Sequence, residues 1–460
     1  KGVHLYNMKK YKEAIPIFQE SDRLDKIEMD STHNRRDYSA MWLASCHYQL
    51  GDEKQAQKIS PYYYKLSPID RRLTIQSDSL SALADKAFEH QDYTKALKLY
   101  KQCDAIEATI LGKNHIWRMT TIANEGYCYS QLSDSTNAIK CFEAHQAACQ
   151  QLYNLECDAA MNTLFALGHE YYNHQFENHY PKALNAYFQA YELAKNLNDS
   201  INYNSSLYCI SLCYFSQSQE NNGDEQGKYL ENAEVFVREL RNDNEEDRYL
   251  KNLIYDNLAN FYNKKSEEYL QDSITLQQAL DYSQKALETY QKKPDADQGV
   301  KRLLEIYKMD CLIRSNKIQE AIELGEDLYA AFLPIRQQES ENYQTLLQNL
   351  SYSYKVLGNE EKNIFYLNLL STSYTQSNQT QNEKILDVFY ELSQAYYRTS
   401  QYKEALHYAK TAKKICNREI YPKKYPYILF NLAQAYLENE QTNNSLACIN
   451  EILSITQPDV

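Results

Sequence analysis

A small residue recurs along this chain of 460 residues at intervals of 40 to 50 residues, and that period limits what the chain can fold into. The recurring positions are Ala14, Ala56, Ala96, Ala138, Ala183, Ala233, Ala279, Ala321, Asn363, Ala405 and Ser445. Nine of these eleven residues are alanine, and half of the ten intervals measure 42 residues. A fixed period of this size is typical of repeat proteins, in which each unit buries its apolar face only against its neighbours.

The segment 392–412 is the clearest copy of the repeat, and its pattern indicates two short amphipathic helices. Leu392, Ser393 and Tyr396 lie at i, i+1 and i+4, on one face of the first helix. The second helix has an equivalent face, made of Tyr402, Ala405, Ala409 and Ala412. Both spacings match the helical period. The segment therefore predicts a helical hairpin in which Ala405 lies where the two helices come closest.

In the first helix of most copies, a small residue is followed three residues later by an aromatic residue. The pairs are Gly126/Tyr129, Gly168/Tyr171, Ser211/Tyr214, Ala259/Tyr262, Ser351/Tyr354, Ser393/Tyr396 and Ala433/Tyr436. Together with the small residue of the second helix, this pattern resembles the tetratricopeptide repeat. The resemblance implies an all-α, right-handed superhelix of about eleven helical hairpins, whose first helices line a concave groove. We expect most of the 43 tyrosines to fill the aromatic positions of the repeat.

The repeat here is roughly eight residues longer than the usual tetratricopeptide unit of about 34 residues. This longer unit is similar to that of kinesin-light-chain arrays, and the segment 110–115, Ile-Leu-Gly-Lys-Asn-His, is similar to their LGK-x-H connector. Bacterial arrays of this kind often precede an effector, including the caspase-like CHAT peptidase. The resemblance therefore implies a regulatory array. Two alternatives stay open: an autoinhibitory sensor array of a CHAT-type peptidase or a signalling kinase, and an end-to-end assembly module.

The spacing of the repeats divides the sequence into an N-terminal array over residues 1–298 and a C-terminal array over residues 299–460. Within the first array, residues 1–155 keep a regular interval, whereas residues 156–298 form longer, irregular units. We expect long polar turns in these units at 173–179, 217–227 and 266–274. The segment 294–299, rich in Pro, Asp and Gly, is the best hinge candidate.

Composition narrows the classes of partner. The net charge is −13 and the basic residues are dispersed, so we expect no nucleic-acid binding. No apolar run approaches the roughly 18 residues that a membrane helix needs, and we expect no membrane contact.

Eleven cysteines without a C-x-x-C pair indicate buried thiols in a reducing, cytoplasmic compartment, with the periplasm as the alternative if a signal sequence has been removed. Because the chain starts at Lys1 and lacks a polar capping helix, we expect it to be a piece of a longer protein.

No motif in the sequence carries recognisable catalytic chemistry. His169-Glu170 followed by His174 resembles the H-E-x-x-H zinc motif, but the two histidines are five residues apart and would point about 140° apart on a helix. The ten glycines form no phosphate-binding loop. We therefore predict a protein that is not an enzyme and has no cofactor or metal. An enzyme with a cleft within residues 160–275 stays as an alternative, which perturbed pKa values in that region would favour.

The predicted concave face carries the candidate binding residues. They lie just before and just after the buried residues of the first helices, and they are Asn124, Tyr127, Asn257, Asn260, Asn349, Tyr352, Gln394, Asn431 and Gln434. Amides recur among them, and an amide both donates and accepts hydrogen bonds. Such a series can pair with the backbone of an extended peptide whatever its side chains. We therefore predict that a partner protein or extended peptide binds in the groove and controls an attached or associated effector.

Overall fold

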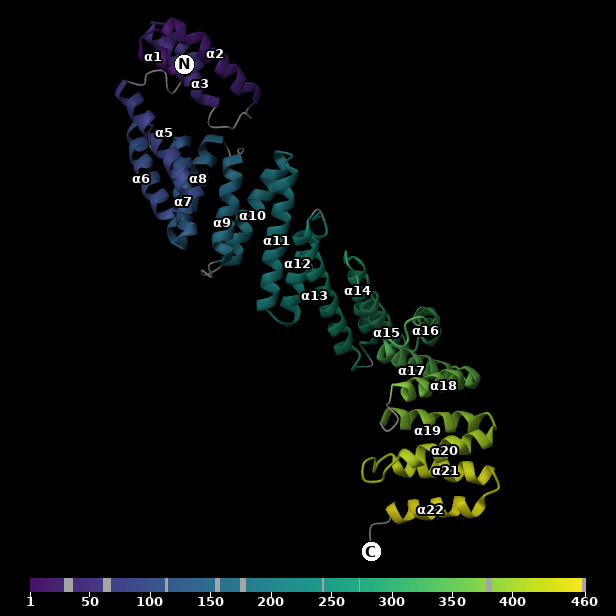
Figure 1. Cartoon of the computed structure of the whole chain (residues 1–460). Helices are drawn as coiled ribbons and strands as arrows, with labels where there is room; N and C mark the ends of the chain where they lie inside the picture. Colours follow the sequence, from purple (N-terminus) through teal and green to yellow (C-terminus); the bar gives the residue numbers. More distant parts are fainter. Residues whose placement is uncertain are drawn as a thin grey trace. The chain divides into compact units, whose positions relative to one another are not determined.

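The computed structural model describes residues 1–28, 36–60, 68–111, 115–153, 158–173, 179–241, 244–272, 274–377 and 383–456. Within these ranges the chain forms helices and no strand, so the predicted all-α class is confirmed (Figure 1). The first twelve helices are α1 (Gly2–Asn7), α2 (Tyr11–Glu28), α3 (Arg36–Gln49), α4 (Glu53–Ile59), α5 (Pro68–Glu89), α6 (Tyr93–Ile110), α7 (Ile116–Gln131), α8 (Ser135–Tyr153), α9 (Asp158–Asn173), α10 (His179–Asn196), α11 (Ser200–Glu220) and α12 (Gly223–Val237).

The remaining helices are α13 (Glu245–Tyr269), α14 (Leu276–Gln291), α15 (Gln298–Arg314), α16 (Ile318–Phe332), α17 (Ser340–Val356), α18 (Glu360–Gln376), α19 (Glu383–Arg398), α20 (Tyr402–Ile415), α21 (Tyr425–Glu438) and α22 (Thr442–Thr456). Each odd-numbered helix contacts the even-numbered helix that follows it, which gives eleven hairpins in the described part of the chain. For α13 and α14 the contact is made by the Ser266 hydroxyl, which donates to the Ala279 carbonyl, and by the stacked rings of Tyr269 and Tyr282. The predicted solenoid of helical hairpins is therefore confirmed. No described helix combines the length and the apolar character that crossing a bilayer requires.

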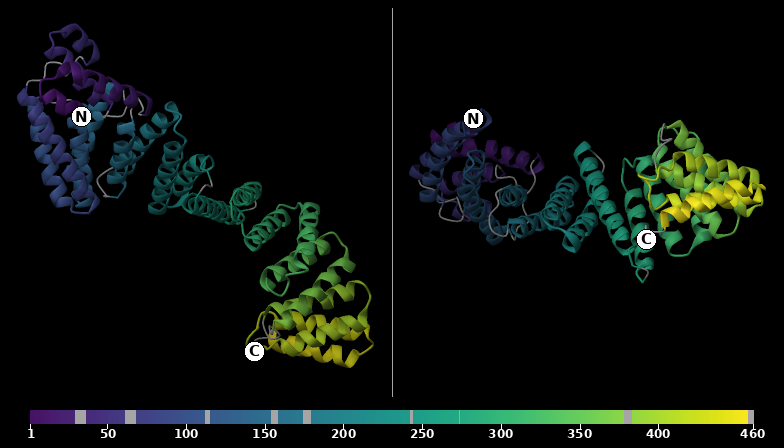
Figure 2. Two further views of the ribbon diagram at one scale, coloured as in Figure 1. Left: turned by 45° about the horizontal axis from the view of Figure 1, so that its top comes forward. Right: turned by 90° about the horizontal axis from the view of Figure 1, so that it is seen from below.

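The chain divides into two compact units, residues 1–247 and residues 248–460. Within unit 2, and in unit 1 from α6 to α11, neighbouring hairpins stack through contacts between the second helix of one and the first helix of the next (Figure 2). The same contact joins α2 to α3. The sequence analysis instead places a boundary between two arrays near residue 298, on the basis of repeat length alone. That boundary and the division into regular and irregular arrays stay predictions.

The recurring small residues lie in the second helix of every hairpin, as the sequence predicts. They occupy the fourth position of that helix in nine hairpins, for example Ala321 in α16 and Ala405 in α20. All eleven are buried, and even the polar Asn363 and Ser445 are at most 4% exposed. A larger side chain at this position would hold the two helices apart, because protein interiors are packed without free space.

The turn inside most hairpins has one fixed backbone conformation. The residue two positions before the second helix adopts a positive φ of about 60°, as in Ser400 (φ 59°), or is a glycine, as in Gly358 (φ 74°). Around Ser400, the Gln401 amide donates to the Tyr396 carbonyl at 2.9 Å and the Ser400 amide donates to the Tyr397 carbonyl at 3.0 Å. This Schellman arrangement ends the first helix. It fixes the turn length and therefore the register between the two helices.

Tyrosine hydroxyls join consecutive hairpins at Glu326 on α16. Tyr354 donates to one carboxylate oxygen of Glu326 at 2.5 Å, and Tyr366 donates to the other at 2.7 Å. The two rings stack with their centroids 5.7 Å apart. Burial alone would raise the pKa of Glu326, but the two hydroxyl bonds and nearby Lys362 outweigh it and lower that pKa.

The next hairpin repeats this joint with an amide in place of the carboxylate. Asn368 on α18 donates to the Tyr396 hydroxyl at 3.2 Å and accepts from the Tyr408 hydroxyl at 3.0 Å. The rings of Tyr396 and Tyr408 are stacked 5.5 Å apart. In both joints the two tyrosines come from one hairpin and the acceptor comes from the hairpin before it. The hydroxyls therefore add a directional contact to the apolar stacking of the hairpins.

The irregular region differs in detail from the sequence-based expectation. The polar loop predicted over 217–227 is wrong, because α11 continues to Glu220 and α12 starts at Gly223. Gly223 adopts a positive φ of 61°, which this short turn requires. The glycine is therefore explained by the short turn, without a long loop. The turn predicted over 173–179 lies largely outside the described residues.

The segment 294–299, predicted as a hinge, is tied to the preceding helices. Asn252 on α13 donates to the Asp295 carboxylate at 2.8 Å and accepts from the Asp295 amide at 3.2 Å. The Asp297 carboxylate accepts from the amides of Gly299 and Val300 at 2.7 Å and 3.0 Å and so caps α15. These contacts hold the segment in one conformation within unit 2.

Substitutions at the turn position should change stability in opposite directions. Replacing Ser400 by glycine should raise the free energy of unfolding by about 0.5–1 kcal/mol, because a non-glycine residue is strained at positive φ. Replacing Gly358 by alanine should lower it by about 1 kcal/mol for the same reason. Urea unfolding followed by circular dichroism measures both. A loss of stability in Ser400→Gly would contradict the account of the turn.

Removing the shared acceptor of the first tyrosine joint should weaken the stacking of the hairpins. We expect Glu326→Ala to destabilise unit 2 by about 1–3 kcal/mol, because two partly buried hydroxyls lose their acceptor. Glu323→Ala is the matched control on the same helix, since Glu323 is exposed, and it should change stability by less than about 0.5 kcal/mol. Equal effects of the two variants on the urea midpoint would show that the hydroxyl bonds contribute nothing.

Candidate partner-binding furrow

Three cavities follow one another across the first helices of unit 2. The largest, of about 670 Å³, lies along α15, α17, α18 and α19. It shares Asp310 and Arg314 with a cavity of about 300 Å³ between α13 and α15, and it shares Asp387 and Glu391 with one of about 270 Å³ between α19 and α21. We call the residues that line these three cavities the furrow. The furrow is therefore a continuous hollow that runs along the first helices from α13 to α21.

The floor of the largest cavity is apolar. It is formed by Leu367, Leu370 and Tyr374 of the second helix α18, with Val388 of α19 beside them. These side chains belong to the core of unit 2 and are only 1–6% exposed, so the cavity reaches no more than their edges. Tyr352 of α17 lies at the edge of the cavity and is 52% exposed. The middle of the furrow thus combines an apolar floor with an exposed aromatic ring.

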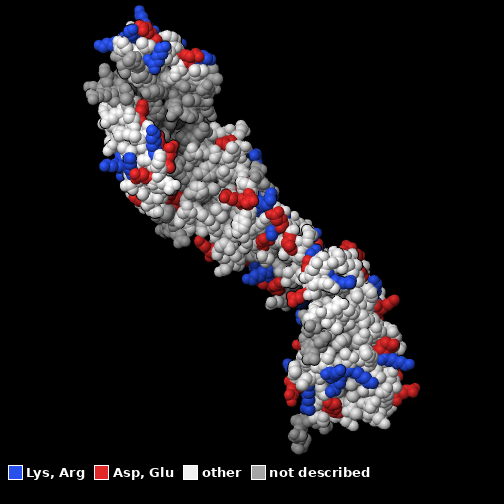
Figure 3. Space-filling view, viewed as in Figure 1, with Lys and Arg blue, Asp and Glu red and all other residues white. Residues whose placement is uncertain are grey.

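Acidic and basic side chains on the furrow pair with each other. The pairs are Arg314–Asp310 at 2.9 Å, Lys355–Glu391 at 2.6 Å and Lys424–Asp387 at 2.5 Å. The last two join α19 to the first helices on either side of it. Burial alone would lower the pKa of Lys424, but its bonds to Asp387 and Glu383 outweigh this and raise that pKa. On the face shown in Figure 3, the two signs of charge are intermingled over unit 2.

Two asparagine amides of the first helices have a buried nitrogen without a hydrogen-bond partner. One is Nδ2 of Asn349 on α17, which lines the furrow. The other is Nδ2 of Asn431 on α21, whose side chain is 1% exposed. The Oδ1 atom of Asn431 accepts a bond of 2.9 Å from Gln394 on α19. A buried donor without an acceptor is costly. Of the two residues, only Asn349 lines a cavity of the furrow, so only its amide lies where a ligand could supply a carbonyl.

The sequence-predicted residues therefore divide into groups. Asn349 and Tyr352 line the furrow, and Gln394 and Asn431 are bonded to each other beside it. Gln434 is half-buried in α21, the helix that carries Asn431. The prediction that these residues bind a partner stays a prediction.

The remaining predicted residues lie on α7 and α13. The side-chain amide of Asn257 donates a hydrogen bond of 2.8 Å to the Leu253 carbonyl in the same helix. Asn260 is exposed. In unit 1, Asn124 is half-buried. The ring of Tyr127 packs 5.0 Å from that of Phe142, and burial raises the pKa of Tyr127 to about 12. Tyr127 therefore contributes to the packing of its hairpin.

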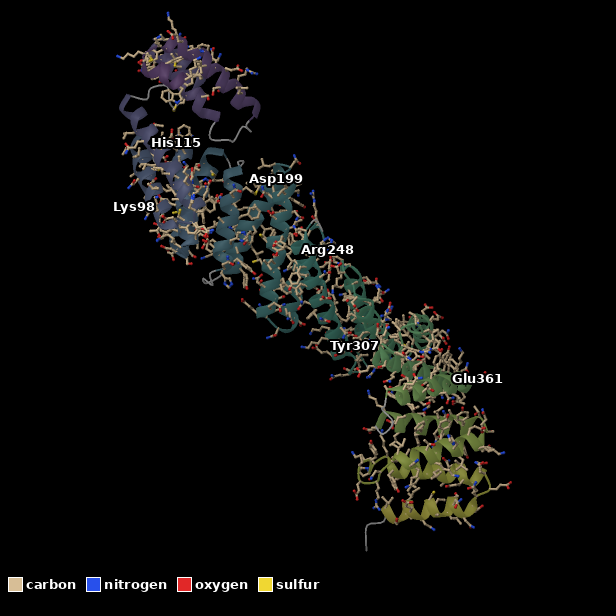
Figure 4. All side chains as sticks on the ribbon, in the orientation of Figure 1. Lys98, His115, Asp199, Arg248, Tyr307 and Glu361 are labelled. Atoms are coloured by element: carbon tan, nitrogen blue, oxygen red, sulfur yellow. The ribbon has the colours of Figure 1, made fainter. Side chains whose placement is uncertain are left out.

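Several furrow residues are not among the predicted set. Lys355, Asp387 and Lys424 line it, and so does Tyr427, which is 68% exposed on α21. Tyr307 on α15, labelled in Figure 4, lines its end near α13. Glu391, which repeat position marks in the sequence as a partner of Gln394 on the concave face, also lines the furrow. Tyr307 occupies the same repeat position, two residues before the position of the buried small residue, and position alone therefore indicates it.

The alternative of an enzyme in the region 160–275 gains no support from its titratable groups. The shifted pKa values among the described residues there belong to tyrosines, cysteines, His169 and the helix cap Asp199. Burial lowers the pKa of His169, whose Nδ1 lies 3.0 Å from the Tyr187 hydroxyl. His174, its counterpart in the zinc-like motif, lies outside the described residues. Within the described ranges no cluster of His, Cys, Asp and Glu has the arrangement of a metal site.

Unit 1 contains a buried carboxyl group that the sequence analysis does not single out. Glu125 on α7 is 8% exposed, and its Oε1 atom is buried without a hydrogen-bond partner. Burial raises the pKa of Glu125 to about 7, and nearby Asp104 raises it further, against the opposing effect of Lys101 and Arg118. The side chain of Glu125 is therefore close to half-protonated at neutral pH.

Comparison with known proteins places one repeat of this chain in a described family. The tetratricopeptide repeat model matches residues 426–459, a range that covers α21 from its second residue and all of α22. No curated protein matches the sequence.

Several solved structures of repeat proteins resemble parts of the chain. BtubC (BKLC) from P. vanneervenii is 16% identical over 55% of this chain and 94% of its own, with a TM-score of 0.38. A putative kinesin light chain with nearly identical TPR-like repeats from Podospora anserina is 16% identical over 42% of this chain and 92% of its own, with a TM-score of 0.37. The quorum sensor NprR from B. thuringiensis, in its apo form, is 13% identical over 84% of this chain and all of its own, with a TM-score of 0.30.

The stability of unit 1 should fall as the pH rises from about 4.5 to about 7. In that range the unfolded chain loses the Glu125 proton, whereas the folded chain keeps it because its pKa is raised. Glu125→Gln replaces the carboxyl by a neutral group of the same shape. We expect this variant to lose that part of the pH dependence and to be more stable above pH 7 by about 1–3 kcal/mol. Urea unfolding at several pH values measures the effect, and an unchanged pH profile would contradict it.

Proposed function

We propose that this chain, an array of helical hairpins whose residues 426–459 match the tetratricopeptide repeat, is a protein-interaction scaffold that binds an extended segment of a partner protein along the furrow of unit 2. The observation that carries the proposal is the continuity of the furrow across first helices from α13 to α21. Successive hairpins place equivalent positions along it. A ligand that crosses several helices would therefore meet a repeating set of contacts.

Backbone recognition is the chemistry that the furrow supports. The unbonded Nδ2 of Asn349 needs an acceptor, and the backbone of an extended segment supplies carbonyl groups. The exposed ring of Tyr352 offers an amphipathic surface to the same segment. The lining consists largely of amides, tyrosines, aliphatic side chains and ion pairs, which supports binding and not catalysis.

The same proposal extends to regulation by the bound partner. Occupation of the furrow would control an effector, either attached to this chain or carried by a partner, and no nucleic acid or membrane takes part. The described cysteines other than Cys46 and Cys149 are thiols outside any disulfide, which favours a reducing, cytoplasmic location. An end-to-end assembly role is the remaining alternative, and concentration-dependent light scattering of the purified chain distinguishes it.

The proposal predicts that peptide binding depends on the furrow. Peptides selected from a random display library against the full chain should bind the double variant Asn349→Ala/Tyr352→Ala at least about tenfold more weakly, because it removes a buried donor and an exposed ring. Fluorescence anisotropy with the selected peptide measures the affinity. The control Gln319→Ala/Glu323→Ala removes an exposed, mutually bonded pair on the second helix α16 and should bind like the original chain. Equal loss in both variants, or none in either, would refute the proposal.

A further inference from the structure

We infer that the furrow selects an uncharged extended segment and discriminates against acidic and basic ones alike. The inference rests on the proposed function and adds the chemical class of the ligand. It follows from the balance of charge along the furrow, which contrasts with the net charge of −13 of the whole chain. The furrow residues include four acidic and four basic side chains: Glu267, Asp310, Asp387 and Glu391, and Arg314, Lys355, Lys384 and Lys424.

Most of these charges already have a partner. Three of the basic side chains form the ion pairs described above. Glu267 accepts a hydrogen bond of 3.1 Å from Asn263. Lys384, at the N-terminal end of α19, is exposed and lacks an ion-pair partner among the residues that the structure describes. Six of the eight charges on the lining are therefore compensated by an ion pair within the furrow.

A charged ligand would have to break these pairs or bind beside them. A carboxylate near Lys355 would also lie near Glu391, which is 2.6 Å from the same lysine, so attraction and repulsion nearly cancel. The ligand charge would still lose part of its hydration, and that cost would not be recovered. The same argument holds for a cation beside Asp387, because Lys424 lies 2.5 Å from it. Only the surroundings of Lys384 would favour a negative charge, and only those of Glu267, whose hydrogen bond comes from the neutral Asn263, would favour a positive one.

The groups that can contribute affinity are the uncharged ones. The unbonded nitrogen of Asn349 calls for a carbonyl oxygen, and the exposed ring of Tyr352 accepts aliphatic or aromatic carbon. Five first helices line the furrow, and neighbouring helices are about 10 Å apart. An extended chain advances about 3.3 Å per residue, so a segment of about 12 residues spans the furrow.

A peptide-selection experiment on the full chain tests the inference. Random peptides of about 12 residues are displayed, and the sequences that the chain enriches are read. The best peptide is then synthesised with one central residue replaced by aspartate or by lysine. Affinities for the original peptide and both charged forms are measured by anisotropy at low and at high salt.

We expect the enriched peptides to lack charge in their central residues. Each charged form should bind at least about tenfold more weakly, because neither sign finds an unpaired counter-charge along most of the furrow. The affinity of the uncharged peptide should change by less than about twofold between the two salt concentrations, since binding neutralises no net charge.

Other results distinguish a failure of this inference about ligand charge from a failure of the proposed function. Enrichment of acidic or basic peptides that still depend on Asn349 and Tyr352 would overturn the inference and leave the proposed function standing. Tighter binding of either charged form, or a steep fall of affinity with salt, would have the same meaning. Failure to enrich any peptide that depends on these two residues would refute the proposed function itself.

Discussion

The close approach of two helices at one small residue is the contact on which the rest of this structure depends. At that position the second helix carries alanine in nine hairpins, and the side chain is fully or almost fully buried in all eleven. Where the facing residue of the first helix is a glycine, a large ring fills the space: an added Cβ on Gly126 would lie 2.7 Å from the Phe142 ring. The Schellman turn before the second helix sets the register that brings these residues together. Each hairpin is therefore a unit of nearly constant shape that can be stacked.

Stacking of constant units explains why unit 2 has a furrow. Equivalent residues of successive first helices fall on the same side, so the positions of Asn349, Glu391 and Asn431 recur along one face. The repeat allows these positions to vary because they do not hold the hairpin together. In α17 and α21 the position is an asparagine with an unbonded nitrogen, whereas in α19 it is a glutamate bonded to Lys355. Of these three residues, Asn349 and Glu391 line the furrow, whereas Asn431 is buried beside it.

The tyrosines have a second structural role besides filling the aromatic positions of the repeat. Tyr354, Tyr366, Tyr396 and Tyr408 fill aromatic positions of the hairpins, as expected, but their hydroxyls also reach Glu326 or Asn368 in the preceding hairpin. Stacked rings alone would permit small slips between neighbouring hairpins. A hydroxyl that must meet one acceptor restricts them, because hydrogen bonds are directional. This restriction helps to keep the first helices, and hence the furrow, in register.

The sequence by itself determined the all-α class, the hairpin repeat and the place of every buried small residue. The reason is that the spacing of apolar and small residues along a helix is a local property, and each copy of the repeat shows it. It also named Asn349 and Tyr352, since repeat position decides which face a residue lies on. Only the tertiary structure decided which candidate amides are already bonded, as Asn431 is to Gln394, and which charges cancel, as those of Lys355 and Glu391 do. These partners are about 40 residues apart in the chain. Their distance depends on how one hairpin packs on the next, and no pattern within a single repeat encodes that packing.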